Sequence, residues 1–186
     1  PARKTWPTDV RYWEYGGGGT IWDATVYDPQ TDLLYFGTGN GTPWNRELRD
    51  PADGDNLYVA SVIAVRPDTG EYVWHYQSTP GETWDHTASQ QIIIADLMIE
   101  GAKRRVLMQA PKNGFFYVID AATGQLLSAK PYTDVNWASG VDMLTGRPIM
   151  VPEARTNLTN KVFNLAPGPA GGHAWQSMSY SPLTKL

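Results

Sequence analysis

Two glycine-rich stretches, residues 16–19 and 37–41, carry the first side chains that could bind a ligand. Trp22 follows the first stretch by three positions, and Asn40 lies within the second. Glycine permits positive φ and lets a backbone approach a flat ligand closely, while Trp22 offers an aromatic face and Asn40 a neutral amide oxygen. In a β protein, however, glycine-rich stretches are usually tight turns, and a neighbouring Trp is usually part of the core. Taken alone, these residues favour the structural interpretation.

Two charged residues further along the chain also lie in expected loops or turns. Asp85 stands in Thr-Trp-Asp-His-Thr, and Lys112 opens Lys-Asn-Gly. An Asp in a loop ordinarily stabilises its own turn, and Lys-Asn-Gly is a common surface hairpin turn. His86 could tune Asp85 if that carboxylate were a base, although neighbouring residues of a strand usually point apart. On residue type alone, the structural interpretation is again the stronger one.

The composition describes a globular chain and excludes several function classes. The 186 residues are 41% hydrophobic and 18% charged, with a net charge of −4, which is enough for one domain with a core. No basic run exceeds three residues, which argues against a nucleic-acid partner. The chain has no cysteine and no apolar run of membrane-spanning length. It also lacks a complete GxGxxG motif, a P-loop and the HExxH of zinc enzymes.

The elements that must position these residues are expected to be strands. No segment has a helical apolar period with caps, whereas β-prone segments alternate with turns. Residues 42–55 and 78–89 are expected to be loops, and the chain from residue 133 onward is expected to be mostly loop. The expected strands are 22–27, 33–37, 57–66, 72–77, 90–95, 105–110, 115–119 and 125–129.

One turn pattern recurs along the chain and indicates the architecture. Its copies are Asp-Pro-Gln-Thr-Asp (28–32), Arg-Pro-Asp-Thr-Gly (66–70), Asp-Ala-Ala-Thr-Gly (120–124), Asp-Met-Leu-Thr-Gly (142–146) and Ser-Pro-Leu-Thr-Lys (181–185). Repeated hairpins with one turn chemistry predict an all-β fold that forms part of a β-propeller, with several four-stranded blades. Trp74, after the second copy, is predicted to dock onto a neighbouring blade. The first copy is followed by a strand, whereas the last copy ends at Leu186 without one. We therefore expect residues 1–186 to be a partial propeller domain with further blades missing at both ends.

Four stretches, in this order and spacing, resemble the alcohol dehydrogenases that depend on pyrroloquinoline quinone (PQQ), a family with an eight-bladed propeller. Each stretch is a weak signal alone, but together they are specific. The segment 64–74 is also similar to the family's tryptophan-docking motif, with Arg66 where an acidic or amide residue is usual. The resemblance covers almost the full chain but well under half of a family catalytic domain. The four stretches are 16–23, 37–45, 83–87 and 110–115.

The resemblance implies a role for each candidate residue of the cofactor site. Trp22 would lie flat against the quinone, and Thr20 would meet the cofactor's carboxylates. Lys112 would donate hydrogen bonds to the quinone oxygens and stabilise negative charge there. Trp175 would line the pocket, although Ala174 stands where the family commonly has an Asn that contacts the cofactor.

The resemblance also implies a calcium site and a general base. Asn40 would give calcium an amide oxygen. Asp85 would take the hydroxyl proton of the alcohol and would also contact the ion. Lanthanide-using relatives carry a second Asp two positions after the base, where this chain has Thr87, so calcium is the expected metal. The family's calcium-ligand Glu and its vicinal disulfide belong to earlier blades and are absent from these residues.

These implications predict a segment of a periplasmic oxidoreductase that oxidises an alcohol to an aldehyde by hydride transfer to PQQ, with Ca²⁺ assistance. A small-molecule alcohol would be its substrate, with a cytochrome c or a haem domain as electron acceptor, and the segment alone would be inactive. One alternative is a non-catalytic propeller repeat protein that acts as an assembly or binding module, which would have no reason to keep Trp22, Asn40, Asp85 and Lys112 together. Another is a PQQ enzyme for a polymeric or polycyclic alcohol.

Overall fold

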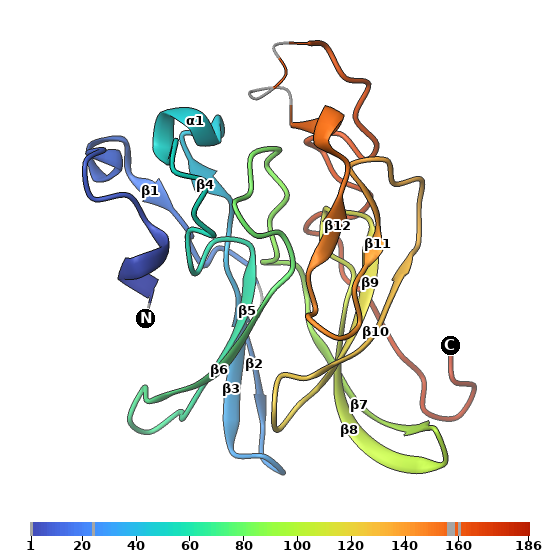
Figure 1. Ribbon diagram of the computed structural model, residues 1–186. Coiled ribbons are helices and arrows are strands. Elements are labelled where there is room, and N and C mark those ends of the chain that lie inside the picture. Colours follow the sequence, from blue (N-terminus) through green and yellow to red (C-terminus); the bar gives the residue numbers. More distant parts are fainter. Residues whose placement is uncertain (1, 24, 156–158, 160) are drawn as a thin grey trace.

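The computed structural model describes residues 2–23, 25–155, 159 and 161–186, and these residues are mostly strands and loops (Figure 1). Two antiparallel sheets of four strands each make up most of the structure. The first has the order β2 (Thr25–Asp28), β3 (Leu33–Gly37), β5 (Ser61–Val65) and β6 (Tyr72–Gln77). The second has the order β7 (Ile93–Ile99), β8 (Ala102–Gln109), β9 (Phe115–Asp120) and β10 (Leu126–Pro131). The all-β prediction is therefore confirmed.

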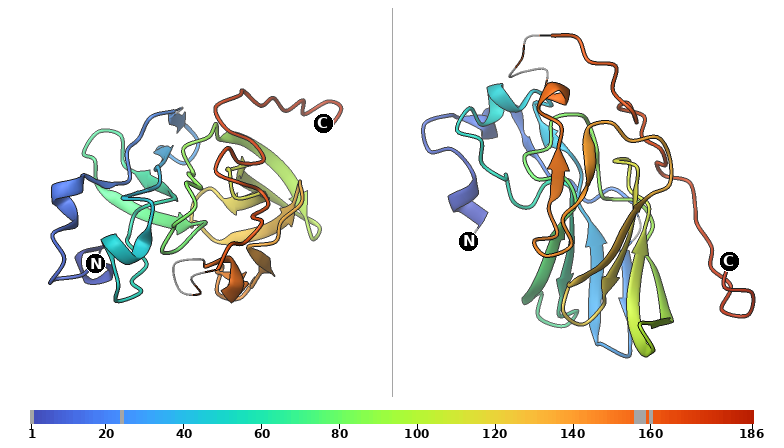
Figure 2. Two further views of the ribbon diagram at one scale, coloured as in Figure 1. Left: turned by 90° about the horizontal axis from the view of Figure 1, so that it is seen from above. Right: turned by 45° about the vertical axis from the view of Figure 1, so that its right-hand side comes forward.

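Two short strand pairs accompany the large sheets. β1 (Gly17–Gly18) pairs with β4 (Gly41–Thr42), and β11 (Ala138–Val141) pairs with β12 (Pro148–Met150). The two four-stranded sheets stand beside each other with their strands running in similar directions (Figure 2). Their shared core contains large aromatic side chains, among them Trp74, Trp84, Tyr117 and Trp137.

Several expected boundaries differ from the structure. β3 and β6 coincide with the predicted strands, but residues 57–60 form a turn rather than the start of β5. The described chain after residue 133 is mostly loop, as predicted, but β11 and β12 were not expected there, because strands of three and four residues are too short to show a period-2 pattern. The long loop at 42–55 contains α1 (Arg46–Arg49), a single turn whose N-cap Asn45 accepts a hydrogen bond from the Glu47 N–H at 2.9 Å. Three 3₁₀ helices were also not expected, η1 (Ala2–Thr5), η2 (Tyr12–Tyr15) and η3 (Pro152–Ala154).

The five copies of the repeated turn share one backbone geometry. In four of them the N–H of the fifth residue donates to the carbonyl of the first, at 2.7 to 2.9 Å. The fifth residue has positive φ in every copy, which explains why Gly occupies it most often. These residues are Asp32 (52°), Gly70 (70°), Gly124 (76°), Gly146 (72°) and Lys185 (62°).

Trp74 docks onto the neighbouring sheet, as the sequence predicts. Its ring lies in β6 and is 6% exposed, and its Nε1–H donates to the Ala121 carbonyl at 3.1 Å. The ring covers Gly124 so closely that a Cβ there would lie 2.6 Å from a ring carbon. Between the same sheets, the Arg105 guanidinium of β8 binds the buried Asp28 carboxylate at 2.8 and 3.1 Å. The repeated turn therefore serves as the contact between one blade-like sheet and the next.

Candidate active site

The segment between β6 and β7 carries Asp85, one member of the central pair of charged side chains. It lies in the upper part of Figure 1, away from the repeated turns of the four-stranded sheets. The Lys112 ammonium, on the turn between β8 and β9, lies 2.8 Å from Asp85 Oδ2. Both side chains are mostly buried, at 13% and 16% exposure. The structure thus brings together two candidates that are 27 positions apart in the sequence.

Asp85 has an unusual backbone, with φ of +66°. Few residues other than glycine adopt this conformation, and it is held only where the surroundings enforce it. The enforcing contacts come from buried polar residues that the sequence analysis did not single out. Arg155 donates to the Gly81 carbonyl at 2.9 Å and stacks over the Trp84 ring at 5.2 Å. Glu82 is fully buried and accepts backbone hydrogen bonds from this segment.

The two glycine-rich stretches pair with each other, which sequence reasoning missed. β1 and β4 join Gly17 to Thr42 and Gly18 to Gly41. A Cβ on Gly18 would lie 2.2 Å from the Asn40 carbonyl oxygen, so only glycine permits this approach. The presence of two glycine-rich stretches within 26 residues was the clue available in the sequence.

This pairing places Thr20, Trp22 and Asn40 beside one another. The Gly39 N–H donates to the Thr20 carbonyl at 2.9 Å, and a Cβ on Gly39 would lie 3.4 Å from Trp22 Nε1. Trp22 is 45% exposed, so the expectation that a Trp beside a glycine turn is usually a core residue does not apply here. The Asn40 Nδ2 donates to the Gly41 carbonyl at 3.0 Å, which directs the amide nitrogen to the backbone. Among the described residues, no hydrogen bond to the Asn40 side-chain oxygen is found.

The stretch around Trp175 passes beside Lys112. Gly171 has φ of +81°, and a Cβ there would lie 2.5 Å from Lys112 Cγ, so glycine is needed for the contact. The Gly172 N–H donates to the Lys112 carbonyl at 3.1 Å, and His173 Nδ1 lies 2.7 Å from the Ala110 carbonyl oxygen. Trp175 itself is 70% exposed. The segment is thus anchored at Lys112, while the Trp175 ring faces solvent.

The family model described as "Glucose/ethanol/alcohol dehydrogenase, beta-propeller domain", labelled PQQ, matches residues 1–139. The chain belongs to this PQQ β-propeller family. The quinohemoprotein alcohol dehydrogenase ADH IIB of Pseudomonas putida is 57% identical over 185 residues, which are all of this chain and 26% of that protein. The chain thus spans about a quarter of the length of the curated relatives it matches.

Solved structures of the family confirm the propeller architecture. The quinohemoprotein alcohol dehydrogenase of Comamonas testosteroni is 49% identical, with a TM-score of 0.95 over 98% of this chain and 27% of that one. A europium-containing methanol dehydrogenase is 39% identical, with a TM-score of 0.88 over 98% of this chain and 31% of that one. The two four-stranded sheets are therefore blades of a PQQ-family propeller, of which this chain forms a part.

His86 does not act on Asp85 in this PQQ-family chain. Its ring is fully buried, 5.7 Å from the Trp84 ring and 5.8 Å from the Trp137 ring, and Nε2 lies 3.1 Å from the Pro167 carbonyl oxygen. Burial lowers the pKa of His86 to about 4, so the imidazole is neutral near pH 7. Asp85 contacts Lys112, whereas the His86 ring packs among aromatic rings, so His86 is a core residue.

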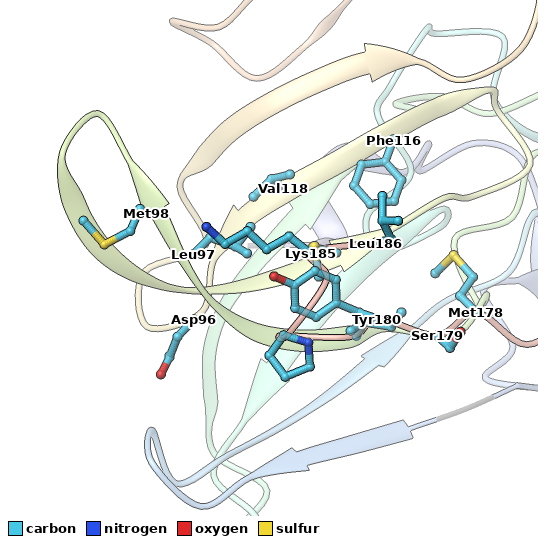
Figure 3. Close-up of a pocket in the computed structure, with 13 residues that line it drawn as sticks. Asp96, Leu97, Met98, Phe116, Val118, Met178, Ser179, Tyr180, Lys185 and Leu186 are labelled. Carbon is cyan, nitrogen blue, oxygen red and sulfur yellow. The ribbon is translucent and has the colours of Figure 1, made fainter.

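A large apolar cavity lies away from these residues. It has a volume of about 770 Å³ and is lined mainly by apolar side chains of β7, β8 and β9 together with the C-terminal residues. Figure 3 shows Tyr180 and Leu186 in this pocket together with Phe116 and Val118, which both belong to β9. None of the six candidate site residues lines it. The candidate chemistry therefore belongs to the Asp85–Lys112 region rather than to this cavity.

A metal ion would find only part of its ligand set in this chain. Within the described ranges, no cluster of three or more His, Cys, Asp or Glu side chains could hold a metal. Asn40 and Asp85 nevertheless offer an amide oxygen and a carboxylate, which are the donor types that calcium prefers. Their segments are joined through Glu82, which accepts the Gly41 N–H at 3.2 Å and the His86 N–H at 2.9 Å. The donor types of these two side chains fit a hard cation.

In the described residues, no helix has the length and apolar character to cross a membrane.

Proposed function

We propose that the full-length protein carrying this segment oxidises an alcohol with PQQ as hydride acceptor and Asp85 as general base. The observation that carries the proposal is the ion pair between Asp85 and Lys112, at 2.8 Å and mostly buried, in a chain of this family. A mostly buried carboxylate paired with a mostly buried ammonium is a common feature of functional sites, and in a chain of this family it suits proton transfer.

Asp85 is oriented to take a proton from a hydroxyl group. Lys112 holds Oδ2, and in the part of the chain that the structure describes Oδ1 accepts no hydrogen bond. An alcohol hydroxyl that donates to Oδ1 would lose its proton to the carboxylate, while its carbon is held for hydride loss. The Lys112 ammonium balances the carboxylate charge and fixes its orientation.

The chain's residues also fit the cofactor that the family name implies. When bound, PQQ supplies a quinone that accepts a hydride. Trp22 is half exposed beside Gly39, where no side chain blocks its approach to a planar ring. The Thr20 carbonyl accepts the Gly39 N–H, and the Thr20 hydroxyl would donate to a cofactor carboxylate. Lys112 would donate to the quinone oxygens, and the exposed Trp175 ring would line the pocket.

Calcium is the metal that we propose. Asn40 and Asp85 provide two of the six to eight oxygen ligands that Ca²⁺ takes, and the cofactor and other parts of the protein would provide the rest. Thr87 is buried, and its hydroxyl accepts a hydrogen bond from Gln90 Nε2 at 2.8 Å. A neutral group at this position gives the region one negative charge fewer than an Asp would, which suits a divalent rather than a trivalent ion.

The cellular setting is part of the same proposal. Several relatives are named quinohemoprotein alcohol dehydrogenases, and a haem group or a cytochrome c would be the electron acceptor here too. We place the protein in the periplasm because of the family resemblance. Fractionation of the source cell checks this, and recovery of the protein with cytoplasmic markers contradicts it.

The decisive experiment separates a dehydrogenase from a propeller scaffold. The full-length protein is freed of cofactor and titrated with PQQ in the presence of calcium, and dye reduction is followed with a short-chain primary alcohol and with a polycyclic alcohol. A dehydrogenase takes up one equivalent of PQQ and reduces the dye only when one of these alcohols is present. A protein that binds no PQQ and reduces no dye with any alcohol is a scaffold.

A further inference from the structure

The buried carboxylate of Glu82 connects the two segments that carry the candidate metal and base residues. Glu82 has no exposed surface and lies three positions before Asp85. A carboxylate taken out of water needs hydrogen-bond donors around it. The donors that surround Glu82 are backbone N–H groups on both sides of Asp85 and next to Asn40.

One oxygen of Glu82 fixes the backbone around Asp85. Oε1 accepts the Trp84 N–H at 2.5 Å and the His86 N–H at 2.9 Å. These two residues flank Asp85, whose φ of +66° is unfavourable for a residue with a side chain. Because the N–H groups of both neighbouring residues donate to the same oxygen, the backbone around Asp85 is held in this conformation, in which its side chain reaches Lys112.

The other oxygen of Glu82 reaches the glycine stretch. Oε2 accepts the Gly41 N–H at 3.2 Å, so the residue after Asn40 is held by the same side chain. The fully buried Arg49 guanidinium supports the arrangement, since it donates to the backbone carbonyl of Glu82 and packs against Gly41. Burial raises the pKa of Glu82, while the backbone N–H donors and Arg49 oppose this effect.

We propose that Glu82 is a positioning residue that sets the relative placement of Asp85 and Asn40. This inference rests on the proposed function, because it gives Glu82 an effect on turnover only through those two residues. Glu82 itself touches neither substrate nor cofactor. Its carboxylate is needed in full, since each oxygen accepts from N–H donors and an amide can accept on one side only.

The test compares Glu82→Gln with Glu71→Gln in the full-length enzyme, with rates normalised to bound PQQ. Gln has nearly the shape of Glu, but its NH₂ group must face either Gly41 or the pair Trp84 and His86. We expect kcat/KM to fall about 10- to 100-fold, mostly through kcat, because small misplacements of a base have this effect. We also expect weaker calcium binding, measured directly by calorimetry. Glu71 is exposed on a distant turn, so its variant should match the parent.

A double-mutant cycle separates this inference from the proposed function. If Asp85 is the base and Glu82 acts through it, Glu82→Gln should lower the rate of an Asp85→Asn enzyme by less than about twofold further. Full activity of Asp85→Asn refutes the proposed function. If Asp85→Asn loses activity but Glu82→Gln turns over as fast as Glu71→Gln, only the positioning role is refuted. The positioning role is also refuted if the rate losses of Glu82→Gln and Asp85→Asn are fully additive.

A second variant covers the case in which Glu82→Gln does not fold. Glu82→Asp keeps the charge and both acceptor oxygens but is one methylene shorter, so it should fold and retain more activity per bound PQQ than Glu82→Gln or Glu82→Ala. If Glu82→Asp and Glu82→Ala fold and show equal activity per bound PQQ, the carboxylate has no positioning role.

Discussion

Asp85 shows how much of the site depends on backbone rather than on residue type. A loop Asp has many ordinary roles, and nothing in Thr-Trp-Asp-His-Thr alone distinguishes a base. The structure adds a positive φ, a cationic partner at 2.8 Å and a buried carboxylate that accepts the N–H groups of both neighbouring residues. Together, these three features fix the position and orientation of the Asp85 carboxylate.

Replacement of Asp85 by Asn tests the base directly. The Asn side-chain oxygen can still accept from Lys112, so we expect the fold and most of the PQQ affinity to remain. Turnover of the full-length enzyme should fall by about 10² to 10⁴, the usual contribution of a general base. Steady-state rates per bound PQQ check this expectation, and a variant that turns over like the parent would show that Asp85 is not the base.

The neutral Thr87 gives a prediction about the metal. Metal-free full-length enzyme should regain activity with calcium and gain little from lanthanum at equal concentration, because the region lacks the extra negative charge that a trivalent ion needs. Thr87→Asp should gain activity with lanthanum, although it loses the hydrogen bond from Gln90. Thr87→Ser keeps a hydroxyl and serves as the control. Restoration of the parent by lanthanum alone would overturn the argument.

At the scale of elements, the sequence predicted the strands whose limits are set by their own alternating residues and flanking turns. β3 and β6 alternate buried and more exposed residues and are bounded by turn residues, so their limits were predicted correctly. The pairing of β1 with β4 depends on residues more than 20 positions apart, and β11 and β12 are too short for a pattern. Glu82 was missed because a single Glu before an aromatic residue is uninformative until its donors are known.

The docking of Trp74 can be measured with a matched pair of glycine variants. Gly124 and Gly70 occupy the same turn position with φ of 76° and 70°, so alanine at either costs about 1–2 kcal/mol of backbone strain. A Cβ at Gly124 would lie 2.6 Å from the Trp74 ring, whereas no atom lies within 4 Å of one at Gly70. Gly124→Ala should therefore lose about 1–3 kcal/mol more from overpacking.

Chemical denaturation of the full-length protein measures both free energies of unfolding. Equal losses for Gly124→Ala and Gly70→Ala would show that the Trp74 contact contributes nothing to the joining of the blades. A greater loss that disappears in a Trp74→Leu background would assign the difference to the docked ring.

At the scale of the molecule, the repeated turn predicted the propeller, and the four ordered stretches predicted the family, whereas the roles of the site residues remain predictions. A full ligand set for the proposed calcium ion could not be predicted from this chain, because Asn40 and Asp85 alone would offer fewer oxygen donors than calcium takes. The sheet of β7 to β10 presents apolar side chains around the 770 Å³ cavity. Two residues that line it are strongly exposed, Met98 of β7 at 68% and the C-terminal Leu186 at 88%.

The 186-residue segment, purified alone, should therefore be inactive and self-associating. It holds only part of the metal and cofactor contacts, and its exposed apolar face should drive association in water. Light scattering should show a concentration-dependent mass above that of the monomer, and Met98→Lys should reduce it more than Met143→Lys, which changes an exposed methionine on the 142–146 turn. Equal effects of the two variants would place the contact elsewhere. Alcohol-dependent dye reduction by the segment with PQQ and calcium would contradict the prediction, because it would show that the residues of this segment are sufficient for catalysis.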